Sequence, residues 1–205
     1  MLKIYLKYIV IIIGINCTSL YSQNIDEDMM SNIKSSIQQK PKILIELDNK
    51  NSFISTRQGW ILGLKVGFNH EDIFRYGISY HSLYNKKYVI IDQLKPTEEN
   101  LHFNYLTIFL EYVFNQQKNY EFSLPISFGP GLSWIDNFYQ STHSYTLLYE
   151  AELNGMYYFF NFIGLGAGVG YRLNFFKNYN IEEKFTAPMY TIKFKLDFYR
   201  LLYAK

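Results

Sequence analysis

An alternation of apolar with small or polar residues runs without a break through residues 162–176, FIGLGAGVGYRLNFF. From Ile163 to Phe175 every second residue is apolar, and between them stand four glycines, Arg172 and Asn174. A period of two is the geometry of a β-strand, whose side chains point alternately to opposite faces. An unbroken apolar face opposite a polar or empty face is typical of a strand with lipid on one side and a crowded, wet interior on the other.

The composition favours a barrel over a helical membrane protein. Aromatic residues make up 19% of the 205 residues, yet the mean hydropathy is only −0.13. A membrane-spanning helix needs about twenty consecutive apolar residues, and no such run follows the N-terminus. Many aromatic residues without long apolar runs fit a β-barrel, because only alternate residues of its strands meet lipid.

The first 22 residues resemble a secretory signal peptide that is cleaved after Ser22. Lys3 and Lys7 give a positive start, and residues 8–15 form a short apolar core. The only cysteine, Cys17, follows Asn16 where lipoprotein processing would need a small residue, so we favour ordinary cleavage over lipidation. The mature chain then contains no cysteine, and therefore no disulfide or thiol chemistry.

The mature chain divides into a periplasmic leader at 23–41 and a transmembrane β-barrel domain at 42–205. Apolar residues recur every four positions at Ile25, Met29, Ile33 and Ile37, so a short amphipathic helix is the alternative to a loose leader. Of the 20 basic residues, cleavage removes two and leaves 18 against 18 acidic ones. This balance gives no support to nucleic-acid binding, which requires a basic stripe.

Eight alternating segments predict an all-β fold, an eight-stranded antiparallel up-and-down transmembrane β-barrel. The first segment is shorter than the roughly 9–11 residues of a transmembrane strand, so we expect it to extend toward residue 55. Pro125 and Pro130 lie within the fifth segment and predict a bulge or a local break there, because proline cannot donate to a ladder. The eight segments are 43–49, 59–69, 74–84, 102–114, 119–134, 144–160, 162–176 and 189–199.

The connections and the aromatic residues support this topology. Outer-membrane barrels alternate short periplasmic turns with longer external loops and carry an aromatic girdle at each interface. The short connections are 69–72, 115–119 and 160–162, and the longer ones are 50–58, 85–100, 135–143 and 177–188. Aromatic residues near the short turns are Phe68, Phe74, Phe114, Tyr120, Phe159 and Phe162; those near the longer loops are Trp60, Tyr84, Phe103, Trp134, Tyr145 and Tyr190.

Charged residues fall on the face that points into the barrel. An eight-stranded barrel is just wide enough for side chains to fill it, and unpaired buried charges are prohibitive. We therefore predict an internal salt-bridge core, with a gated ion path as the alternative. Glu150 and Glu152 have a spacing compatible with acid and base roles, but pairing with basic neighbours is the favoured reading. The predicted polar network comprises Lys65, Arg75, Glu111, Glu121, Glu150, Glu152, Arg172, Lys193, Lys195 and Asp197.

Three histidines near the external rim, His81, His102 and His143, are the candidate binding or catalytic residues. A rim hydrolase or acyltransferase would need a nucleophile, a base and an orienting acid within hydrogen-bond reach, and no spacing in the chain enforces that. The chain also shows no metal-ligand spacing, and its glycine rhythm at 164–170 lies in a strand with no helix after it, which excludes a nucleotide loop. We expect no cofactor and no metal.

Several short segments resemble small eight-stranded outer-membrane β-barrel proteins, and most closely those of Bacteroidota. They are SLYSQ at the end of the signal peptide, DNKNSFIS at 48–55, FLEYVF at 109–114 and GLGAGVGYRL at 164–173. The resemblance implies location in the cell outer membrane, with membrane lipids and the barrel-insertion machinery as partners. Such barrels serve as anchors, adhesins, pores and lipid enzymes, so it leaves the activity open. Their usual terminal aromatic residue is absent, since Tyr203 precedes the end by two residues.

We therefore expect a structural anchor whose external loops bind a ligand. The longest loop, 85–100, contains Tyr88-Val89-Ile90-Ile91, which predicts a hairpin above the membrane and makes this loop the first place to look for a binding surface. The alternatives are a lipid-modifying enzyme with its active site at the rim, a narrow pore, and a lipocalin-like periplasmic carrier with its apolar face turned inward.

Overall fold

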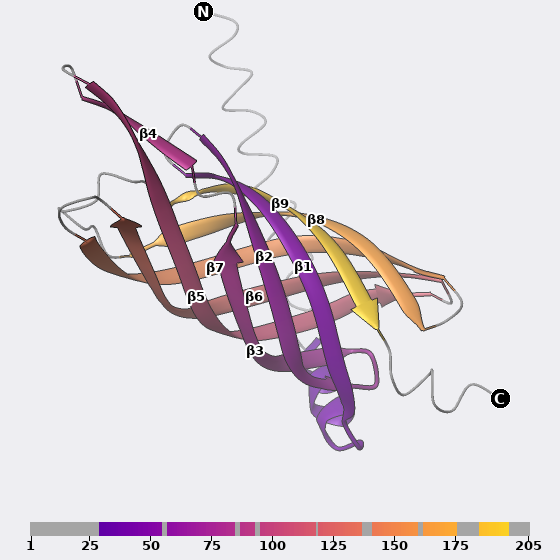
Figure 1. The fold of residues 1–205 in the computed structure, drawn as a ribbon. Helices are drawn as coiled ribbons and strands as arrows, with labels where there is room; N and C mark the ends of the chain where they lie inside the picture. The colour runs from indigo at the N-terminus through magenta and orange to yellow at the C-terminus, as the bar shows by residue number, and fades with distance from the viewer. Residues whose placement is uncertain are drawn as a thin grey trace, which may run out of the picture. The chain divides into compact units, whose positions relative to one another are not determined.

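A closed antiparallel β-barrel of eight strands dominates the computed structural model (Figure 1). The structure describes residues 29–54, 57–84, 87–92, 95–117, 119–136, 141–159, 162–175 and 185–196, with side chains described in these ranges except at 54–58, 87–100 and 135–142. The strands are β1 (Lys42–Ile54), β2 (Arg57–His70), β3 (Phe74–Leu83), β4 (Lys87–Asp92), β5 (Lys95–Gln116), β6 (Tyr120–Asp136), β7 (Ser141–Phe159), β8 (Ile163–Asn174) and β9 (Ala187–Leu196).

The barrel strands pair with their neighbours in sequence, and the first pairs with the last. β1 pairs antiparallel with both β2 and β9, and β3 pairs with β5, which closes the sheet. β4 stands outside the barrel and pairs with the first residues of β5. The predicted eight-stranded up-and-down barrel is therefore confirmed, and the predicted hairpin in the longest loop is formed by β4 and β5.

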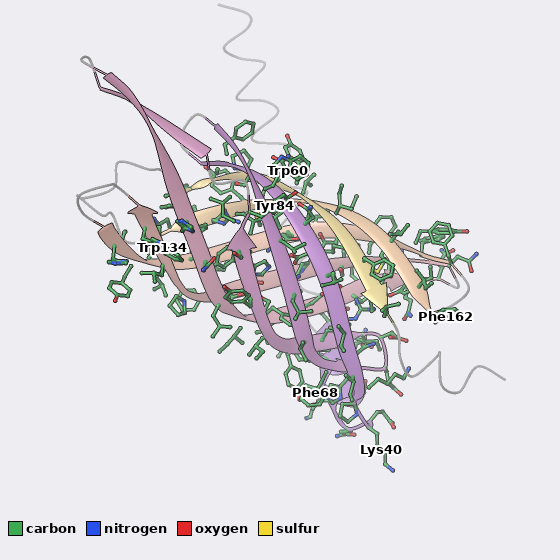
Figure 2. The ribbon with its side chains drawn as sticks, viewed as in Figure 1. Lys40, Trp60, Phe68, Tyr84, Trp134 and Phe162 are labelled. Carbon is green, nitrogen blue, oxygen red and sulfur yellow. The ribbon has the colours of Figure 1, made fainter. Side chains whose placement is uncertain are left out.

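The two faces of each strand divide as the alternation predicts. On β8, Leu165 and Val169 are 47% and 53% exposed on the outer wall, whereas Arg172 is fully buried inside. The same division holds on the other barrel strands, so the outer wall is a continuous apolar surface (Figure 2). This wall is what a transmembrane barrel presents to lipid. It contradicts the inside-out carrier, in which apolar residues would fill the interior.

Aromatic side chains mark both ends of the outer wall. Figure 2 shows Trp60, Tyr84 and Trp134 toward one end and Phe68 and Phe162 toward the end with the short turns. Such girdles lie at the headgroup level of a bilayer.

Phe103 does not belong to a girdle, contrary to the prediction. Its side chain points into the barrel and is fully buried. It is an even number of residues from Thr107 and Glu111 on β5, so it lies on the same face as these two residues, which also point inward.

Two strands continue well past the predicted segments, β1 at its end and β5 at its start. β1 extends to Ile54, which confirms the expected extension of the first segment toward residue 55, and the bounds of 50–58 predicted for the loop are wrong. β5, β6 and β7 have 22, 17 and 19 residues, against the roughly 9–11 that cross a bilayer. The backbone ladder does not end with the hydrophobic pattern, because hydrogen bonding between antiparallel strands continues wherever the strands stay adjacent.

Of the bulge or local break predicted at the two prolines of β6, the structure shows the break. The register between β6 and its neighbours is the same on both sides of Pro125 and Pro130, and the shift lies instead between Val113 and Asn115 on β5. The paired residues of β6 omit Pro125 toward β7 and Pro130 toward β5. Each proline thus interrupts the ladder on one side only, as expected from its missing N–H.

The hairpin between β2 and β3 turns through two residues with left-handed backbone, Glu71 (φ 50°) and Asp72 (φ 59°). The amide of Ile73 donates to the carbonyl of His70 at 2.9 Å. Positive φ at both central residues is the geometry of a type I′ turn, whose twist matches that of the flanking strands.

The described residues before the barrel contain a short helix at 29–37. The helical alternative for this part of the leader is therefore the one observed. Within the described residues, no helix is long and apolar enough to cross a membrane. The predicted signal peptide at 1–22 lies outside the described residues. The first part of the predicted leader, residues 23–28 with Ile25, also lies outside them.

Candidate functional site in the barrel lumen and at its rim

Twelve buried charged side chains from the eight barrel strands fill the described lumen. They include nine of the ten residues of the predicted network; the tenth, Asp197, lies outside the described residues. We call these twelve residues the ion-pair stack: Glu46, Asp48, Lys50, Lys65, Arg75, Glu111, Glu121, Glu150, Glu152, Arg172, Lys193 and Lys195, each at most 5% exposed.

The end of the stack nearest the short turns is built around Arg75. Its guanidinium group donates to Glu111 at 2.9 Å and, through two nitrogens, to Glu121 at 2.7 and 2.6 Å. Lys195 lies 3.6 Å from Glu121 and donates to the hydroxyl of Tyr158 at 2.7 Å. The two-nitrogen contact gives Arg75 a fixed orientation that a single ion pair would not.

Two lysines share one carboxylate in the middle of the stack. Lys65 and Lys193 approach the same Glu46 oxygen at 3.4 and 3.2 Å. Lys65 also lies 3.6 Å from Asp48, and Lys193 lies 3.8 Å from Glu152. These contacts join β1, β2, β7 and β9 across the lumen.

Lys50 lies between the two glutamates that superficially resembled an acid–base pair. Its ammonium group contacts Glu150 and lies 2.9 Å from Glu152. Arg172 donates to Glu150 at 2.7 Å and to the Tyr105 hydroxyl at 2.9 Å, and that hydroxyl donates to Glu150 at 2.9 Å. Both carboxylates are thus neutralised by basic neighbours.

Lys50 is missing from the predicted network because residues 50–58 were interpreted as a loop. The signal was present in the sequence, since Lys50 has the same parity as Glu46 and Asp48. Extending the first segment by one more pair of residues would have placed it inside the barrel.

The charges of the stack balance, with six acidic and six basic side chains. An ion-selective pore carries rings of one sign of charge, whereas a balanced set in contact neutralises itself. The stack therefore has the chemistry of a packed polar core rather than that of a selective path.

Glycines on β8 and β2 give the stack its room. A Cβ atom on Gly168 would lie 1.9 Å from Oδ1 of Asn154, and a Cβ on Gly63 would lie 1.9 Å from Oδ1 of Asp48 and 2.3 Å from Cδ2 of His81. The absence of side chains at these positions lets neighbouring strands send theirs across the lumen. The room beside Gly168 is occupied by the side chain of Asn154.

An apolar cluster lies beyond the stack, toward the long strands. Phe103 stacks on Phe185 with ring centroids 4.4 Å apart, and the guanidinium of Arg172 lies 5.8 Å from the Phe103 ring. This cluster was not predicted, because inward residues were expected to be polar, although every second residue of these strands points inside. We call it the apolar cap: Ile61, Leu83, Leu101, Phe103, Tyr105, Leu148 and Phe185.

The three candidate histidines do not form one site. His81 is fully buried in the lumen, where its ring stacks on Tyr105 at 4.5 Å and its Nε2 lies 3.3 Å from Asp48. His102 is on the outer wall, where it stacks on Trp134 with centroids 4.7 Å apart. His143 is the register partner of Trp134 on β7 and is exposed.

The serines near these histidines in the sequence also do not gather at one site. The Ser79 hydroxyl lies 2.6 Å from that of Thr107 in the lumen, and Ser82 donates to Asn104 at 2.7 Å. Ser144 is buried facing the interior. The described side chains thus bring no serine, histidine and acid into one triad, and they hold no group of three His, Cys, Asp or Glu residues that would bind a metal.

Asp72 lies in the β2–β3 turn, near the end of the stack that contains Arg75 and Lys195. It accepts a hydrogen bond from Asn69 and lies 3.6 Å from Lys42. Burial by itself would raise the pKa of this carboxyl, but the positive charges of Lys195, Arg75 and Lys42 hold its pKa well below the ordinary value of 3.8. Asp72 is therefore an anion at neutral pH that favours the folded turn.

Comparisons with solved structures agree with this architecture. No family model and no curated protein sequence matches the chain. Neisserial surface protein A is similar in structure, with a TM-score of 0.56 and 12% identity over 76% of this chain and 95% of that one. The attachment invasion locus protein Ail of Yersinia pestis, solved with the heparin analogue sucrose octasulfate, has a TM-score of 0.50 and 8% identity over 77% and 99% of the chains.

The outer-membrane enzyme PagL is a more distant match, with a TM-score of 0.38 and 13% identity over 74% of this chain and 98% of that one. At these identities the likeness shows the fold alone. That fold is the small outer-membrane β-barrel, and the apolar outer wall of this chain is suited to span a membrane.

Proposed function

We propose that the protein is an outer-membrane anchor that displays a raised β-sheet for binding a partner outside the cell. The observation that carries this proposal is the length of β5, β6 and β7, which exceeds a membrane crossing by about half or more. Together with β4 they form a sheet that continues beyond the apolar wall, as Figure 1 shows for β4 and β5.

The raised sheet offers a backbone edge for recognition. β4 lies at the end of the sheet order and, among the described strands, pairs with β5. An extended segment of a partner can add to such an edge through main-chain hydrogen bonds, with side chains supplying specificity. The barrel below holds the sheet in place and takes no direct part in binding.

The lumen supports an anchoring role over a pore. The ion-pair stack is balanced in charge, and the apolar cap lies between the stack and the raised strands. Hydrated ions would have to displace both layers, and desolvating either is costly.

The proposal is also non-enzymatic, because the rim histidines are separated and the lumenal carboxylates are neutralised. Insertion by the barrel-assembly machinery and a relationship to Bacteroidota envelope barrels, as the segments at 48–55 and 164–173 imply, are part of the same proposal.

A hairpin deletion tests the anchor-and-display arrangement. Residues 87–99 are replaced by a two-residue turn, and cells producing the wild type or the variant are compared for retention on surfaces coated with matrix proteins or with sulfated glycans. Soluble sucrose octasulfate, the ligand in the Ail structure, serves as a competitor on the glycan surfaces.

We expect the variant to keep the heat-dependent gel shift of a folded barrel and to lose retention. Loss of the gel shift would show that the hairpin is needed for folding. Unchanged retention on every surface that holds wild-type cells would contradict display by this sheet. Altered masses of the envelope lipids on expression of the wild type would favour the enzyme instead.

A further inference from the structure

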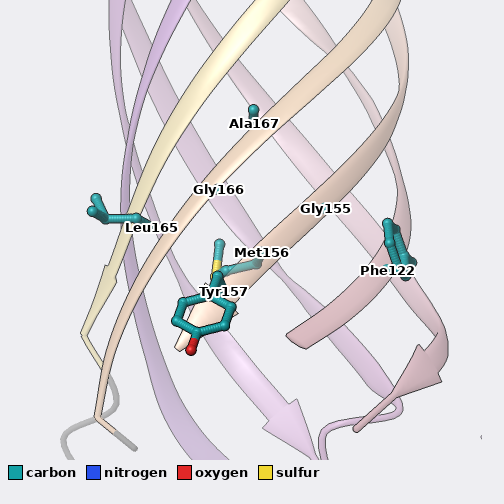
Figure 3. Close-up of a pocket in the computed structure, with 7 residues that line it drawn as sticks. All are labelled: Phe122, Gly155, Met156, Tyr157, Leu165, Gly166 and Ala167. Carbon is teal, nitrogen blue, oxygen red and sulfur yellow. The ribbon is translucent and has the colours of Figure 1, made fainter. Parts of the chain in front are cut away.

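A hollow lies on the outer wall between large apolar side chains. It measures about 390 Å³ and is formed where β6, β7 and β8 run side by side (Figure 3). This volume lies within the range of small-molecule sites, roughly 300–1,000 Å³. The hollow is lined by Phe122, Gly155, Met156, Tyr157, Leu165, Gly166 and Ala167.

The hollow exists because two adjacent outward positions carry almost no side chain. Gly155 on β7 is in register with Ala167 on β8 and with Phe122 on β6. The next outward pair toward the short turns is Tyr157 with Leu165, 45% and 47% exposed. The small pair is thus a gap in a row of large side chains.

Bulky residues also bound the gap on its other side. Leu153 and Val169, the outward pair beyond it, are 47% and 53% exposed. The floor of the hollow is formed by Gly166 and Met156, a register pair of the inward face. Their backbone groups lie within the ladder between β7 and β8, and the Met156 side chain is apolar.

The hollow lies in one leaflet of the membrane. Gly155 is four residues before the end of β7 and Ala167 is four residues after the start of β8, which corresponds to about 13 Å along a strand. The hydrocarbon core is about 30 Å thick. The gap therefore falls in the half of the core beside the short turns, which are the periplasmic turns in outer-membrane barrels.

We propose that this hollow binds one acyl chain of a phospholipid from the leaflet beside the short turns. The wall around it is already the interface with lipid, so the hollow is a continuation of that interface. A flexible hydrocarbon chain can bend between Leu165 and Phe122 and fill the gap. Figure 3 shows the Tyr157 hydroxyl directed toward the short-turn end, where the headgroup of that lipid would lie.

A second copy of the barrel is a poorer occupant. A two-fold interface brings the same patch of each copy together, so two hollows would face each other and leave a void. Voids forfeit dispersion contacts. The proposal is independent of what the raised sheet binds, and its test leaves that sheet unchanged.

The test fills the hollow without disturbing the barrel. Ala167→Leu adds bulk from an outward position, and Ala151→Leu is the matched control, an outward alanine on β7 that does not line the hollow. Wild type and both variants are reconstituted with phosphatidylethanolamine, extracted in a mild detergent and examined by native mass spectrometry. A heat-dependent gel shift verifies that each is folded.

We expect a one-phospholipid complex of the wild type and of Ala151→Leu, and about a tenfold lower fraction for Ala167→Leu, since burial of at least two methylene groups is lost. An equal lipid-bound fraction for Ala167→Leu and the wild type would overturn the proposal, as would equal losses in both variants. A wild-type dimer that Ala167→Leu dissociates would identify a second copy as the occupant and would also overturn it.

Discussion

The ion-pair stack and the apolar cap fill the same lumen with opposite chemistry. Both consist of inward side chains, and both are almost completely buried. The stack is held by charged pairs such as Arg75 with Glu121, and the cap by packed rings such as Phe103 with Phe185. The stack lies at the level of the apolar outer wall, whereas the cap lies toward the raised strands.

The difference shows which layer depends on its partners. A buried charge is tolerated only with its counter-charge, so removing one member of the stack leaves the other exposed to a low-dielectric interior. An apolar side chain in the cap leaves only a cavity when it is truncated. Stack positions should therefore be coupled in pairs, and cap positions should be close to independent.

The largest effect is expected from Arg75→Met. It leaves Glu111 without the arginine and Glu121 with Lys195 as its remaining basic contact. We expect the free energy of unfolding to fall by about 3–5 kcal/mol, measured by urea titration in lipid vesicles. Adding Glu111→Gln should recover about half of that loss, since one unpaired carboxylate is removed. A loss below about 1 kcal/mol for the single variant would erase the distinction between the layers.

Phe103→Ala probes the cap by the same measurement. It removes the stacked contact with Phe185 and leaves a cavity near the mouth. We expect a loss of about 3 kcal/mol, the lower end of the range for a buried phenylalanine, because water near the mouth can enter. Combined with Arg75→Met, the two losses should add within about 0.5 kcal/mol. Strong coupling between them would mean that the layers are one unit.

Gly63→Ala tests how tightly the stack is packed where it meets the cap. The added methyl would lie within 2.3 Å of both Asp48 and His81, so this pair must move apart. We expect a loss of about 1–3 kcal/mol. Gly155→Ala on the outer wall is the control, because there the nearest atom is on the Phe122 ring at 3.2 Å and the expected loss is smaller. Equal losses for the two variants would argue that the stack is loosely packed.

The smallest effect concerns Asp72, at the edge of the stack. A carboxyl whose pKa is lowered on folding adds stability above its unfolded value of 3.8, and that stability is lost as pH falls through the folded pKa. Asp72→Asn should therefore cost about 1 kcal/mol at pH 7. The gap between wild type and variant should close only below about pH 4. A gap that persists unchanged at lower pH would assign the effect to the turn geometry rather than to charge.

Alternation predicted which residues share a face, since a period of two places every second residue on the same side of a strand. Residues such as Leu165 and Lys193 were placed on the correct face for this reason. The up-and-down strand order was predicted from the alternating short and long connections. The ends of the strands were not predictable in this way. Lys50 was assigned to a loop because the apolar pattern stops before it, although the backbone ladder continues.

The candidate site shows the same limit. Parity predicted that Glu150 and Arg172 point inward, and the structure pairs them. It also places Phe103 inward, but this residue was predicted to belong to the aromatic girdle of the outer wall. Which strands are adjacent at a given height depends on register and shear. For that reason the separation of His81 from His102 is visible only in the folded barrel.

Thiol accessibility in vesicles tests the central claim most directly. Single cysteines are placed at Leu165 on the outer wall and at Ser127 in the lumen, in a chain with Cys17 replaced, and each is treated with a membrane-permeant maleimide and with a charged aqueous thiosulfonate. The account predicts that the cysteine at 165 reacts with the maleimide alone and that the cysteine at 127 reacts with neither. Rapid reaction at 127 with the thiosulfonate would show an open aqueous lumen. Reaction at 127 with the maleimide, together with a protected 165, would show that the barrel is inside out.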